Sequence, residues 1–329
     1  MGPPPAWPGF RPLRVSRKLQ ESSNVTSLVL EPADGKPLTA APAGQFIVLR
    51  LRPRPDESAL LRSYSLSGAT SKDRYRISVK REPHGAAGAY IDTQVQAGDM
   101  LDVSAPRGSF TLRQDDGPVV LVSAGIGATP VLSMLHALAA EQTRREIWWV
   151  HGGRNSSEHP FAAEVRELLK TLSGSRSHIR YSAPIPTDRP TVDFDRVGRM
   201  GVPVFEEIGV PPDADFYICG PAAFMSGLVD GLAGRGVTRN RLHTENFGSG
   251  QSMTPGIAVV PRRPPHPPGE AAEVGPLVSF TRSNLAVRWD SAFHSLLDQQ
   301  NRRSLRHGRA FSYASHSFGA CQYMCRDVQ

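Results

Sequence analysis

The chain has 329 residues, of which 39% are hydrophobic and 21% are charged, and this composition is typical of a soluble globular protein. Its length exceeds that of one ordinary domain and predicts two domains, with room for an appendage. The formal net charge is +7, but residues 299–329 carry five arginines against one aspartate. No basic stripe runs through the rest of the chain, and this argues against nucleic-acid binding.

Two further features indicate the cellular setting. The N-terminus has no apolar core of signal-peptide length, and no later apolar run approaches the length of a membrane span. Three cysteines, Cys219, Cys321 and Cys325, are too few for a disulfide framework and fit a reducing compartment. We therefore expect a cytoplasmic protein with no membrane partner. Residues 1–12 form a proline-containing N-terminal segment that resembles an interdomain linker.

Residues 13–114 predict a domain of short strands separated by turn residues, with one short helix beginning near Gly88. The expected strands are 13–21, 25–32, 46–52, 60–68, 75–82, 100–106 and 109–112. So many strands with so little helix between them indicate an antiparallel β-barrel.

Residues 115–248 predict a second domain, because strands and helices alternate there. The expected strands are 119–125, 146–153, 178–183, 215–220 and 241–247, and the expected helices are 131–141, 161–172 and 223–236. Continuously apolar strands alternating with amphipathic helices predict an α/β domain with a parallel sheet covered on both faces.

The remaining residues fall into two parts. Residues 249–274 are rich in proline, which indicates a stiff linker or a polyproline ligand for a partner. Within residues 275–329, the stretch 275–298 predicts a hairpin followed by the start of a helix, and the rest has no clear period.

Three short motifs are candidates for binding. On the strand 60–68, Arg62 and Tyr64 share one face while Ser63 and Ser65 share the other, so a cation lies beside a flat ring. Gly125 and Gly127 end a strand immediately before a helix, where backbone amides can approach a phosphate.

We expect Thr129 to cap that helix and Pro130 to lie in its first turn. The glycines alone leave open a pyrophosphate site or plain turn chemistry. Cys219, Gly220 and Pro221 repeat the strand-to-helix arrangement, at the edge of a parallel sheet where ligands bind. Taken by itself, Cys219 favours the interpretation of a small buried apolar residue.

Residues 13–248 resemble the ferredoxin–NADP reductase superfamily, most closely the reductase halves of flavohaemoglobins and of phthalate-dioxygenase-type reductases. The resemblance rests on six motifs in order: RSYSLSG, ISVKRE, GDMLDVSAPRGSF, AGIGATPVLSML, DFYICGPAAFM and HTENFG.

The resemblance implies a flavin site. Arg62 would neutralise a flavin phosphate, which suits a guanidinium group. Tyr64 would lie beside the isoalloxazine ring and Ser65 would reach toward its N5. Lys80, Arg81 and the loop that ends at Gly88 before a helix would complete the site. The resemblance favours FAD, and FMN stays open because Ala89 stands where many relatives have a serine.

The resemblance also implies a site for NAD(P)H. Cys219, with Gly220 and Pro221, would neighbour the nicotinamide, and Gly125, Gly127 and Thr129 would face the pyrophosphate. Glu245 and Phe247 would approach the flavin ring. Arg154 would meet a 2′-phosphate or a ribose, which leaves NADH and NADPH both open.

Plain structural roles stand beside these assignments. Glu245 could be a solvated charge and Phe247 a core residue, while His159 and Phe161 are interpreted as packing at the start of a helix. Ser65, Cys219 and Glu245 are the candidate catalytic residues, which tune the reaction rather than act as nucleophiles.

The stretch 275–298 resembles the opening hairpin and first helix of a plant-type ferredoxin domain. A [2Fe-2S] cluster needs four thiolates, and this chain offers only Cys321 and Cys325 in C-x3-C spacing. We therefore expect no cluster and no metal in this chain, and a ferredoxin module interrupted after about Asp298 by a frameshift or a divergent gene end. A zinc site at Cys321, Cys325 and nearby histidines is the alternative.

These inferences predict an NAD(P)H-dependent flavin oxidoreductase. Hydride passes from nicotinamide to flavin N5, and electrons then go singly to an acceptor protein or a small molecule. One alternative is the reductase component of a multi-component oxygenase that relays electrons through a separate ferredoxin. Two others are a non-catalytic flavin- or nucleotide-binding module and an unstable product without function.

Overall fold

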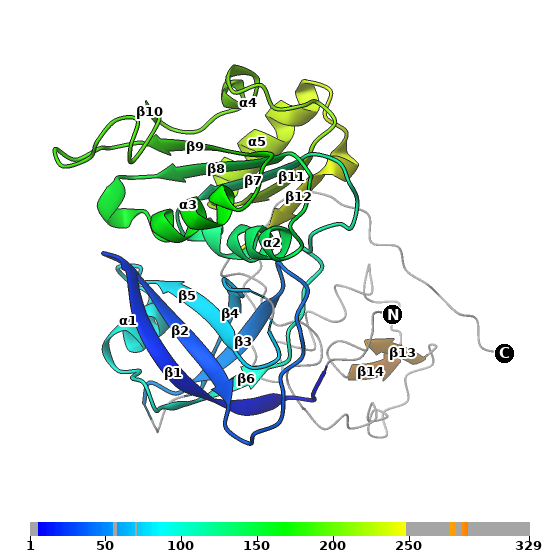
Figure 1. Ribbon diagram of the computed structural model, residues 1–329. Helices are drawn as coiled ribbons and strands as arrows, with labels where there is room; N and C mark the ends of the chain where they lie inside the picture. The colour runs from blue at the N-terminus through cyan, green and yellow to red at the C-terminus, as the bar shows by residue number, and fades with distance from the viewer. Residues whose placement is uncertain (1–5, 55–57, 70, 248–276, 281–284, 289–329) are drawn as a thin grey trace. The chain divides into compact units, whose positions relative to one another are not determined.

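The computed structural model of the chain describes residues 6–54, 58–69, 71–247, 277–280 and 285–288. It divides into two compact units. The first contains two lobes, which Figure 1 shows as a barrel and a sheet covered by helices. The second contains the antiparallel hairpin of β13 (Leu277–Phe280) and β14 (Leu285–Arg288), which confirms the predicted hairpin. The other predictions for residues 249–329, namely the linker, the helix start and the cysteine pair, lie outside the described residues.

The barrel lobe is an antiparallel sheet of six strands in the order β4-β3-β6-β1-β2-β5, as the alternating patterns predict. Its strands are β1 (Phe10–Ser22), β2 (Val25–Pro32), β3 (Phe46–Leu51), β4 (Leu60–Ser65), β5 (Tyr75–Lys80) and β6 (Met100–Ser104). A single bridge between Leu66 and Ile77 joins the β4 and β5 edges and closes the barrel.

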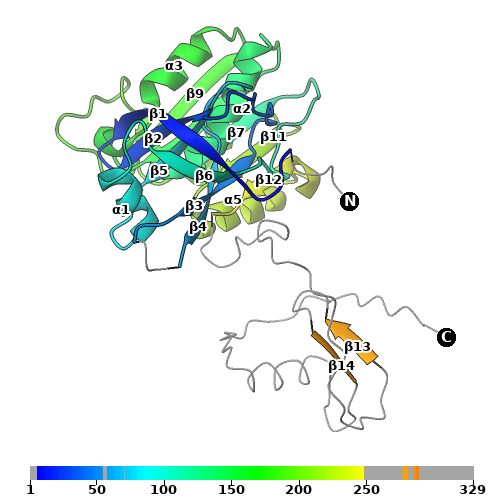
Figure 2. The same cartoon turned by 90° about the horizontal axis from the view of Figure 1, so that it is seen from below.

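Helix α1 (Ala86–Thr93) lies beside β5 (Figure 2) and contributes Ala87 and Ile91 to the barrel core. The predicted short helix is therefore present, although it begins at Ala86 and not at Gly88. The prediction of a seventh strand at residues 109–112 was wrong. Phe110 in that stretch is buried in the core of the neighbouring lobe, edge-on to Tyr217 at 5.9 Å between ring centroids, so the segment leaves the barrel sheet to anchor the two lobes together.

The α/β lobe is a parallel sheet of six strands in the order β10-β9-β8-β7-β11-β12. Its strands are β7 (Val119–Ala124), β8 (Ile147–Gly153), β9 (Ser175–Tyr181), β10 (Arg196–Val197), β11 (Asp215–Cys219) and β12 (Leu242–Glu245). The two-residue β10 is an addition to the predicted set. Every residue of β11 is buried, and so are the first five of β7 and of β8, as expected for strands covered on both faces.

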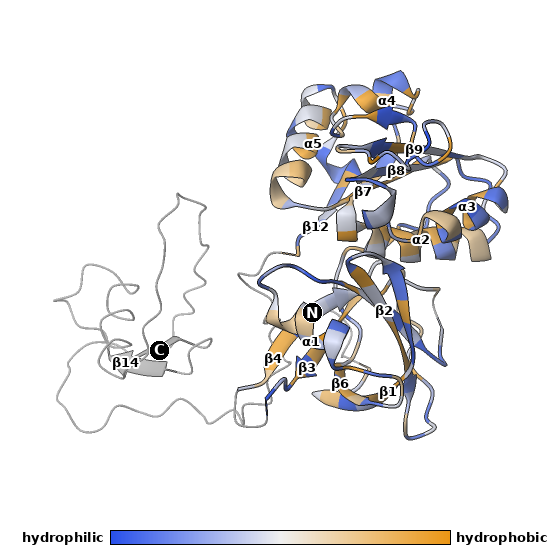
Figure 3. Ribbon diagram, turned by 90° about the vertical axis from the view of Figure 1, so that its left-hand side faces the viewer, coloured by the Kyte–Doolittle hydropathy of each residue, from blue (hydrophilic) through white to orange (hydrophobic). Residues whose placement is uncertain are grey.

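Helices cover both faces of this sheet (Figure 1). Helices α2 (Ala128–Ala140) and α3 (Ala162–Lys170) pack on the face toward the barrel, while α4 (Pro203–Glu207) and α5 (Ala222–Gly234) pack on the other. Figure 3 shows α2 largely in the apolar colours, between the sheet and the barrel. Among the described residues, no helix is both long and apolar enough to cross a membrane.

A buried pair of histidines sits beneath the carboxyl end of β8. The rings of His151 and His159 stack at 4.5 Å between centroids. Nδ1 of His151 lies 2.8 Å from the Ser123 hydroxyl, and Nδ1 of His159 lies 2.9 Å from the Tyr181 hydroxyl. Burial, with a contribution from the positive charge of Arg166, lowers the pKa of His159 from 6.5 to about 4. Both rings are therefore neutral near pH 7.

Acidification should destabilise the fold through this pair. Because the folded pKa of His159 lies below the unfolded one, the unfolded state binds more protons, and stability falls as the pH drops from 6.5 toward 4. Between about pH 7.5 and about pH 5, this group should lower the free energy of unfolding by about 2 kcal/mol. Urea unfolding followed by tryptophan fluorescence at the two pH values measures the loss.

The variant His159→Gln, which keeps hydrogen-bonding groups but does not titrate, should lose part of this pH dependence. The exposed His84 provides the matched control, because His84→Gln should leave the dependence unchanged. Equal pH dependence in His159→Gln and the wild-type protein would contradict the assignment.

Candidate functional site

The strand that carries the RSYS motif presents its side chains in the expected alternation. In β4, Arg62 is exposed and Tyr64 packs against the barrel core, while Ser65 is only 3% exposed. The Arg62 guanidinium donates a hydrogen bond to the Leu61 carbonyl at 2.8 Å. Burial raises the pKa of Tyr64 to about 12, so its phenol stays neutral. An exposed cation and a neutral ring therefore lie along one strand, as predicted.

The opposite alternation places two serine hydroxyls in a buried position without partners. The Oγ atoms of Ser63 and Ser65 are both buried, and neither has a hydrogen-bond partner among the residues that the structure describes. A buried polar group left unpaired costs about 1–3 kcal/mol, so such groups call for an explanation. A bound ligand with polar atoms at this strand would supply it. These residues therefore fit the flavin that the motif predicts.

The second predicted part of the flavin site lies at the end of β5 and in α1. Lys80 forms an ion pair with Glu82 at 2.8 Å, and Arg81 forms one with Asp92 at 3.0 Å. The prediction of a loop up to Gly88 was wrong, because α1 already begins at Ala86 and Gly88 is a helical residue. A Cβ on Gly88 would lie 2.9 Å from the Lys80 carbonyl oxygen, so its smallness permits close packing of α1 on β5.

The glycine turn after β7 forms a short 3₁₀ turn, Gly125–Gly127, that leads into α2. Gly125 has a positive φ of 54°, a conformation that glycine adopts without cost. A Cβ on Gly127 would lie 2.2 Å from the Cys219 carbonyl oxygen, so only glycine fits between the two strand ends.

The prediction that Thr129 caps the helix was wrong. Thr129 already lies inside α2, where its hydroxyl donates to the Ile126 carbonyl at 3.0 Å, and within the described ranges no side chain caps this helix. Pro130 does lie in the first turn. The first-turn amides of α2 therefore have no side-chain cap and can bind a phosphate.

Cys219 and Glu245 come together at the carboxyl edge of the sheet. They are register partners in β11 and β12, and the Cys219 thiol donates a hydrogen bond to the Glu245 carbonyl at 3.4 Å. Burial, helped by the nearby Glu245 carboxyl, raises the pKa of the Cys219 thiol, which stays protonated. Burial also raises the pKa of Glu245 from 4.5 to about 7. This carboxyl can therefore change its charge near neutral pH.

The neighbouring residues complete this edge. Gly220 packs against Ala124 and the Phe224 ring, and Pro221 immediately precedes α5, as expected for a helix-opening proline. Phe247 is 41% exposed, which does not support the alternative of a core residue. Arg154 follows β8, is 68% exposed and lies 3.7 Å from Glu158.

The site residues predicted from the sequence thus form two groups in the structure. Gly125, Gly127, Cys219, Gly220 and Glu245 gather at the carboxyl edge of the parallel sheet, and Arg62, Tyr64 and Ser65 lie on β4 of the barrel. One ion pair was not predicted from the sequence: the partly buried pair of Arg76 with Glu164, which joins the lobes. These residues are 88 positions apart, and no local pattern marks them.

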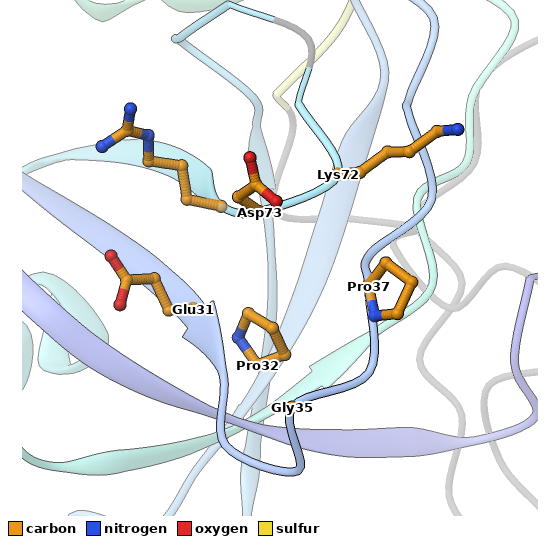
Figure 4. A pocket seen from close by; sticks show the side chains of 7 residues that line it. Glu31, Pro32, Gly35, Pro37, Lys72 and Asp73 are labelled. Atoms are coloured by element: carbon orange, nitrogen blue, oxygen red, sulfur yellow. The ribbon is translucent and has the colours of Figure 1, made fainter.

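A separate surface pocket of about 440 Å³ lies away from these groups. Figure 4 shows that it is formed by the turn after β2 and the segment before β5. Its lining mixes both signs of charge, and it includes none of the residues that the sequence analysis predicted: Glu31, Pro32, Gly35, Pro37, Lys72, Asp73 and Arg74. Among the described residues, no group of histidine, cysteine and acidic side chains has the arrangement of a metal site.

Comparison with protein families assigns each lobe. Residues 12–112 match the family described as the oxidoreductase FAD-binding domain, and residues 121–230 match the oxidoreductase NAD-binding domain. The flavohemoprotein of Deinococcus radiodurans is 40% identical over 256 residues, which are 78% of this chain and 64% of that protein. The flavohemoprotein of Chromobacterium violaceum is 39% identical over 74% of this chain and 62% of that protein. The chain thus spans less than two thirds of these relatives.

Solved structures give the same result. The flavohem-like FAD/NAD binding domain of nitric oxide dioxygenase from Vibrio cholerae has a TM-score of 0.66 and 35% identity, covering 73% of this chain and 98% of that one. Phthalate dioxygenase reductase, described as a modular structure for electron transfer from pyridine nucleotides to [2Fe-2S], has a TM-score of 0.59 and 26% identity. It covers 92% of this chain and 82% of that one.

The variant Gly127→Ala should disrupt the carboxyl edge. Its Cβ would meet backbone atoms of Cys219 and Gly220, which cannot rotate away. We expect a loss of about 1–3 kcal/mol in the free energy of unfolding, the usual cost of overpacking. Gly227→Ala is the matched control, because Gly227 is an exposed residue of α5 with open space around its Cβ position. Equal urea midpoints for the two variants would contradict the close approach.

Proposed function

Because this chain belongs to the flavohaemoprotein-type family of FAD- and NAD-binding oxidoreductases, we propose that it passes hydride from NAD(P)H to FAD and then single electrons to an acceptor. The observation that carries the proposal is the buried hydroxyl of Ser65, which has no hydrogen-bond partner in the described part of the chain and follows Tyr64 on the motif strand. When bound, FAD supplies hydride acceptance at N5 and one-electron release.

In this proposal, side chains of the barrel lobe bind and orient the flavin. We propose that the exposed guanidinium of Arg62 pairs with a flavin phosphate and that the neutral ring of Tyr64 covers the isoalloxazine. The hydroxyl of Ser65 then finds its missing partner at N5. Lys80, Arg81 and the start of α1, next to Gly88, contribute to holding the cofactor phosphates. The ion pairs of Lys80 and Arg81 orient these two cations.

The α/β lobe positions the nucleotide. The amides of Gly125 and Gly127, with the uncapped start of α2 at Thr129, suit the pyrophosphate. Cys219, Gly220 and Pro221 shape the nicotinamide pocket, where the protonated thiol is a compact neutral neighbour. In this proposal Arg154, which is exposed after β8, meets the ribose or a 2′-phosphate. Phe247 covers the ring site from its exposed position after β12.

Glu245 provides charge complementarity in this proposal. Oxidation of the reduced nicotinamide leaves a positive charge on its ring, and a nearby carboxylate stabilises that charge as it develops. At its raised pKa, Glu245 is only partly ionised near neutral pH. Its protonation state therefore controls how much of this stabilisation is present.

The acceptor is proposed as a separate domain, protein or small molecule in the cytoplasm. The similarity to phthalate dioxygenase reductase extends over 92% of this chain, and it favours one specific alternative. In that alternative the chain is the reductase component of an oxygenase system, and electrons pass through a [2Fe-2S] ferredoxin supplied by another protein.

The visible absorption spectrum of the purified chain tests the reductase proposal. Flavin bands should bleach on anaerobic addition of NADH or NADPH and return on addition of ferricyanide, a one-electron acceptor. A protein that cannot be loaded with FAD or FMN would contradict the proposal, and a loaded protein that neither nucleotide reduces would leave a non-catalytic binding module. Stoichiometric iron and acid-labile sulfide would show that this chain holds its own cluster.

The rate of flavin reduction should rise with pH through about 7, because Glu245 ionises there and its carboxylate favours nicotinamide oxidation. Stopped-flow flavin bleaching at saturating NADH measures this limiting rate. The variant Glu245→Gln, which imitates the protonated acid, should be slower and should lose the inflection. Glu167→Gln alters an exposed acid of α3, paired only locally with Lys170, and should keep the inflection. If the Glu245→Gln variant keeps the same inflection, the proposed role of Glu245 in nicotinamide oxidation is wrong.

A further inference from the structure

A bidentate ion pair crosses from the barrel lobe to the α/β lobe. Arg76 on β5 donates from Nη1 to Oε2 of Glu164 at 2.9 Å and from Nη2 to Oε1 at 2.8 Å. Nε2 of His136 on α2 lies 2.6 Å from the same Oε1. The Arg76 and Glu164 side chains are only 17% and 26% exposed, so solvent screens their interaction less than it screens a surface pair.

Further contacts hold the members of this triad in place. The Arg76 guanidinium lies 5.5 Å from the centroid of the Phe161 ring, at the start of α3. Burial raises the pKa of Glu164, but its hydrogen bonds with His136 and Arg76 outweigh that effect and keep the pKa below its usual value. Glu164 is therefore an anion that binds two helices and a strand together.

On the barrel side, the triad is tied to the residues that follow the flavin motif. The Arg76 guanidinium donates to the Ser67 carbonyl, and the Ser67 amide donates to the Arg76 carbonyl at 2.9 Å. Ser67 lies two residues after Ser65 in the chain, and Leu66 between them makes the bridge that closes the barrel. A shift of Arg76 would therefore move the end of the motif strand.

On the α/β side, the triad is tied to the helix that starts at the glycine turn. His136 lies on α2, which begins directly after Gly127. The same helix carries Ser133, whose hydroxyl accepts a hydrogen bond from the Gly44 amide of the barrel at 2.8 Å. Under the proposed function, the triad thus connects the strand that holds the flavin ring with the helix whose start holds the pyrophosphate of the nucleotide.

We propose that Arg76, Glu164 and His136 form a positioning element that sets the distance between nicotinamide and flavin for hydride transfer. The inference rests on the proposed function. None of the three residues is assigned a contact with either cofactor, and the element acts through the placement of Ser67 and α2. Hydride transfer is sensitive to such placement, because a misplacement of about 1 Å costs up to about a hundred-fold in rate.

The test uses the full chain loaded with FAD and the variants Arg76→Gln, Arg76→Lys and Glu164→Gln. Stopped-flow bleaching of the flavin by NADH, and by NADH deuterated at the transferred position, gives the limiting rate, the Kd for NADH and the isotope effect. Arg76→Gln and Glu164→Gln should lower the limiting rate at least about ten-fold, within the range that misplacement produces. Flavin content and Kd should change less than about two-fold, because no cofactor contact is lost.

The conservative and double variants separate positioning from general destabilisation. Arg76→Lys keeps the charge but loses the bidentate fork, so its rate should lie between those of the wild-type protein and Arg76→Gln. The double variant Arg76→Gln with Glu164→Gln should be no slower than the slower single variant, because both remove one interaction. The isotope effect should change in the slow variants, since the geometry of the transfer itself is altered.

Arg50→Gln is the matched control. Arg50 also pairs with a carboxylate, Asp102 at 2.8 Å, and also lies over an aromatic ring, Phe10 at 4.6 Å, but both partners belong to the barrel lobe. The Arg50→Gln variant should have a lower unfolding temperature than the wild-type protein but should reduce flavin at the same rate. If Arg76→Gln and Glu164→Gln are less stable but reduce flavin at the wild-type rate, the positioning role is wrong. If NADH does not reduce the FAD of the wild-type protein, the proposed function itself fails.

Discussion

Burial of α2 on two sides is the constraint on which the rest of the described structure depends. One side of the helix covers the parallel sheet through Leu132 and Leu135, while its hydroxyl residue Ser133 binds the barrel backbone at Gly44. Gly44 has a φ of 99°, and a Cβ there would clash with the Phe110 carbonyl and approach Met134. Two chain segments from different lobes therefore meet at van der Waals distance, and interiors packed so closely transmit small displacements.

This packing also orients the chemistry. The glycine turn that is proposed to hold the pyrophosphate is the start of α2, so its position is set by the same helix that contacts the barrel. The carboxyl edge of the sheet is crowded in the same way, because Gly127 lies against the Cys219 backbone. Burial there keeps the Cys219 thiol protonated and raises the pKa of Glu245 to about 7. Geometry and charge at this edge thus have one common origin, which is exclusion of water.

Much of this arrangement could be predicted from the sequence, and the failures have physical reasons. Continuous apolar runs correctly predicted strands such as β7 and β11. The alternation of side chains predicted for β4 was also correct at Arg62 and Tyr64. Local patterns could not show that Phe110 leaves its barrel to enter a neighbouring core, because that choice depends on a partner surface remote in the chain. Likewise, Thr129 has a capping side chain by type, but the 3₁₀ turn moves the helix start ahead of it. The pairing of Arg76 with Glu164 depends wholly on tertiary structure.

The closure of the barrel has a consequence for how the protein opens. Strand β4 has a continuous ladder with β3 on one side. On the other side, the described residues join it to β5 through the bridge between Leu66 and Ile77 and through the hydrogen bonds of the following Ser67 with Arg76. Because the closure between β4 and β5 has few backbone hydrogen bonds to break, local opening at β4 costs less free energy than opening the centre of the sheet. An unpaired strand edge is also a template for association with another chain. A ligand bound on β4 would stabilise the closure between β4 and β5. The ligand-free protein would then exchange its amide hydrogens faster and aggregate more readily than the ligand-bound protein.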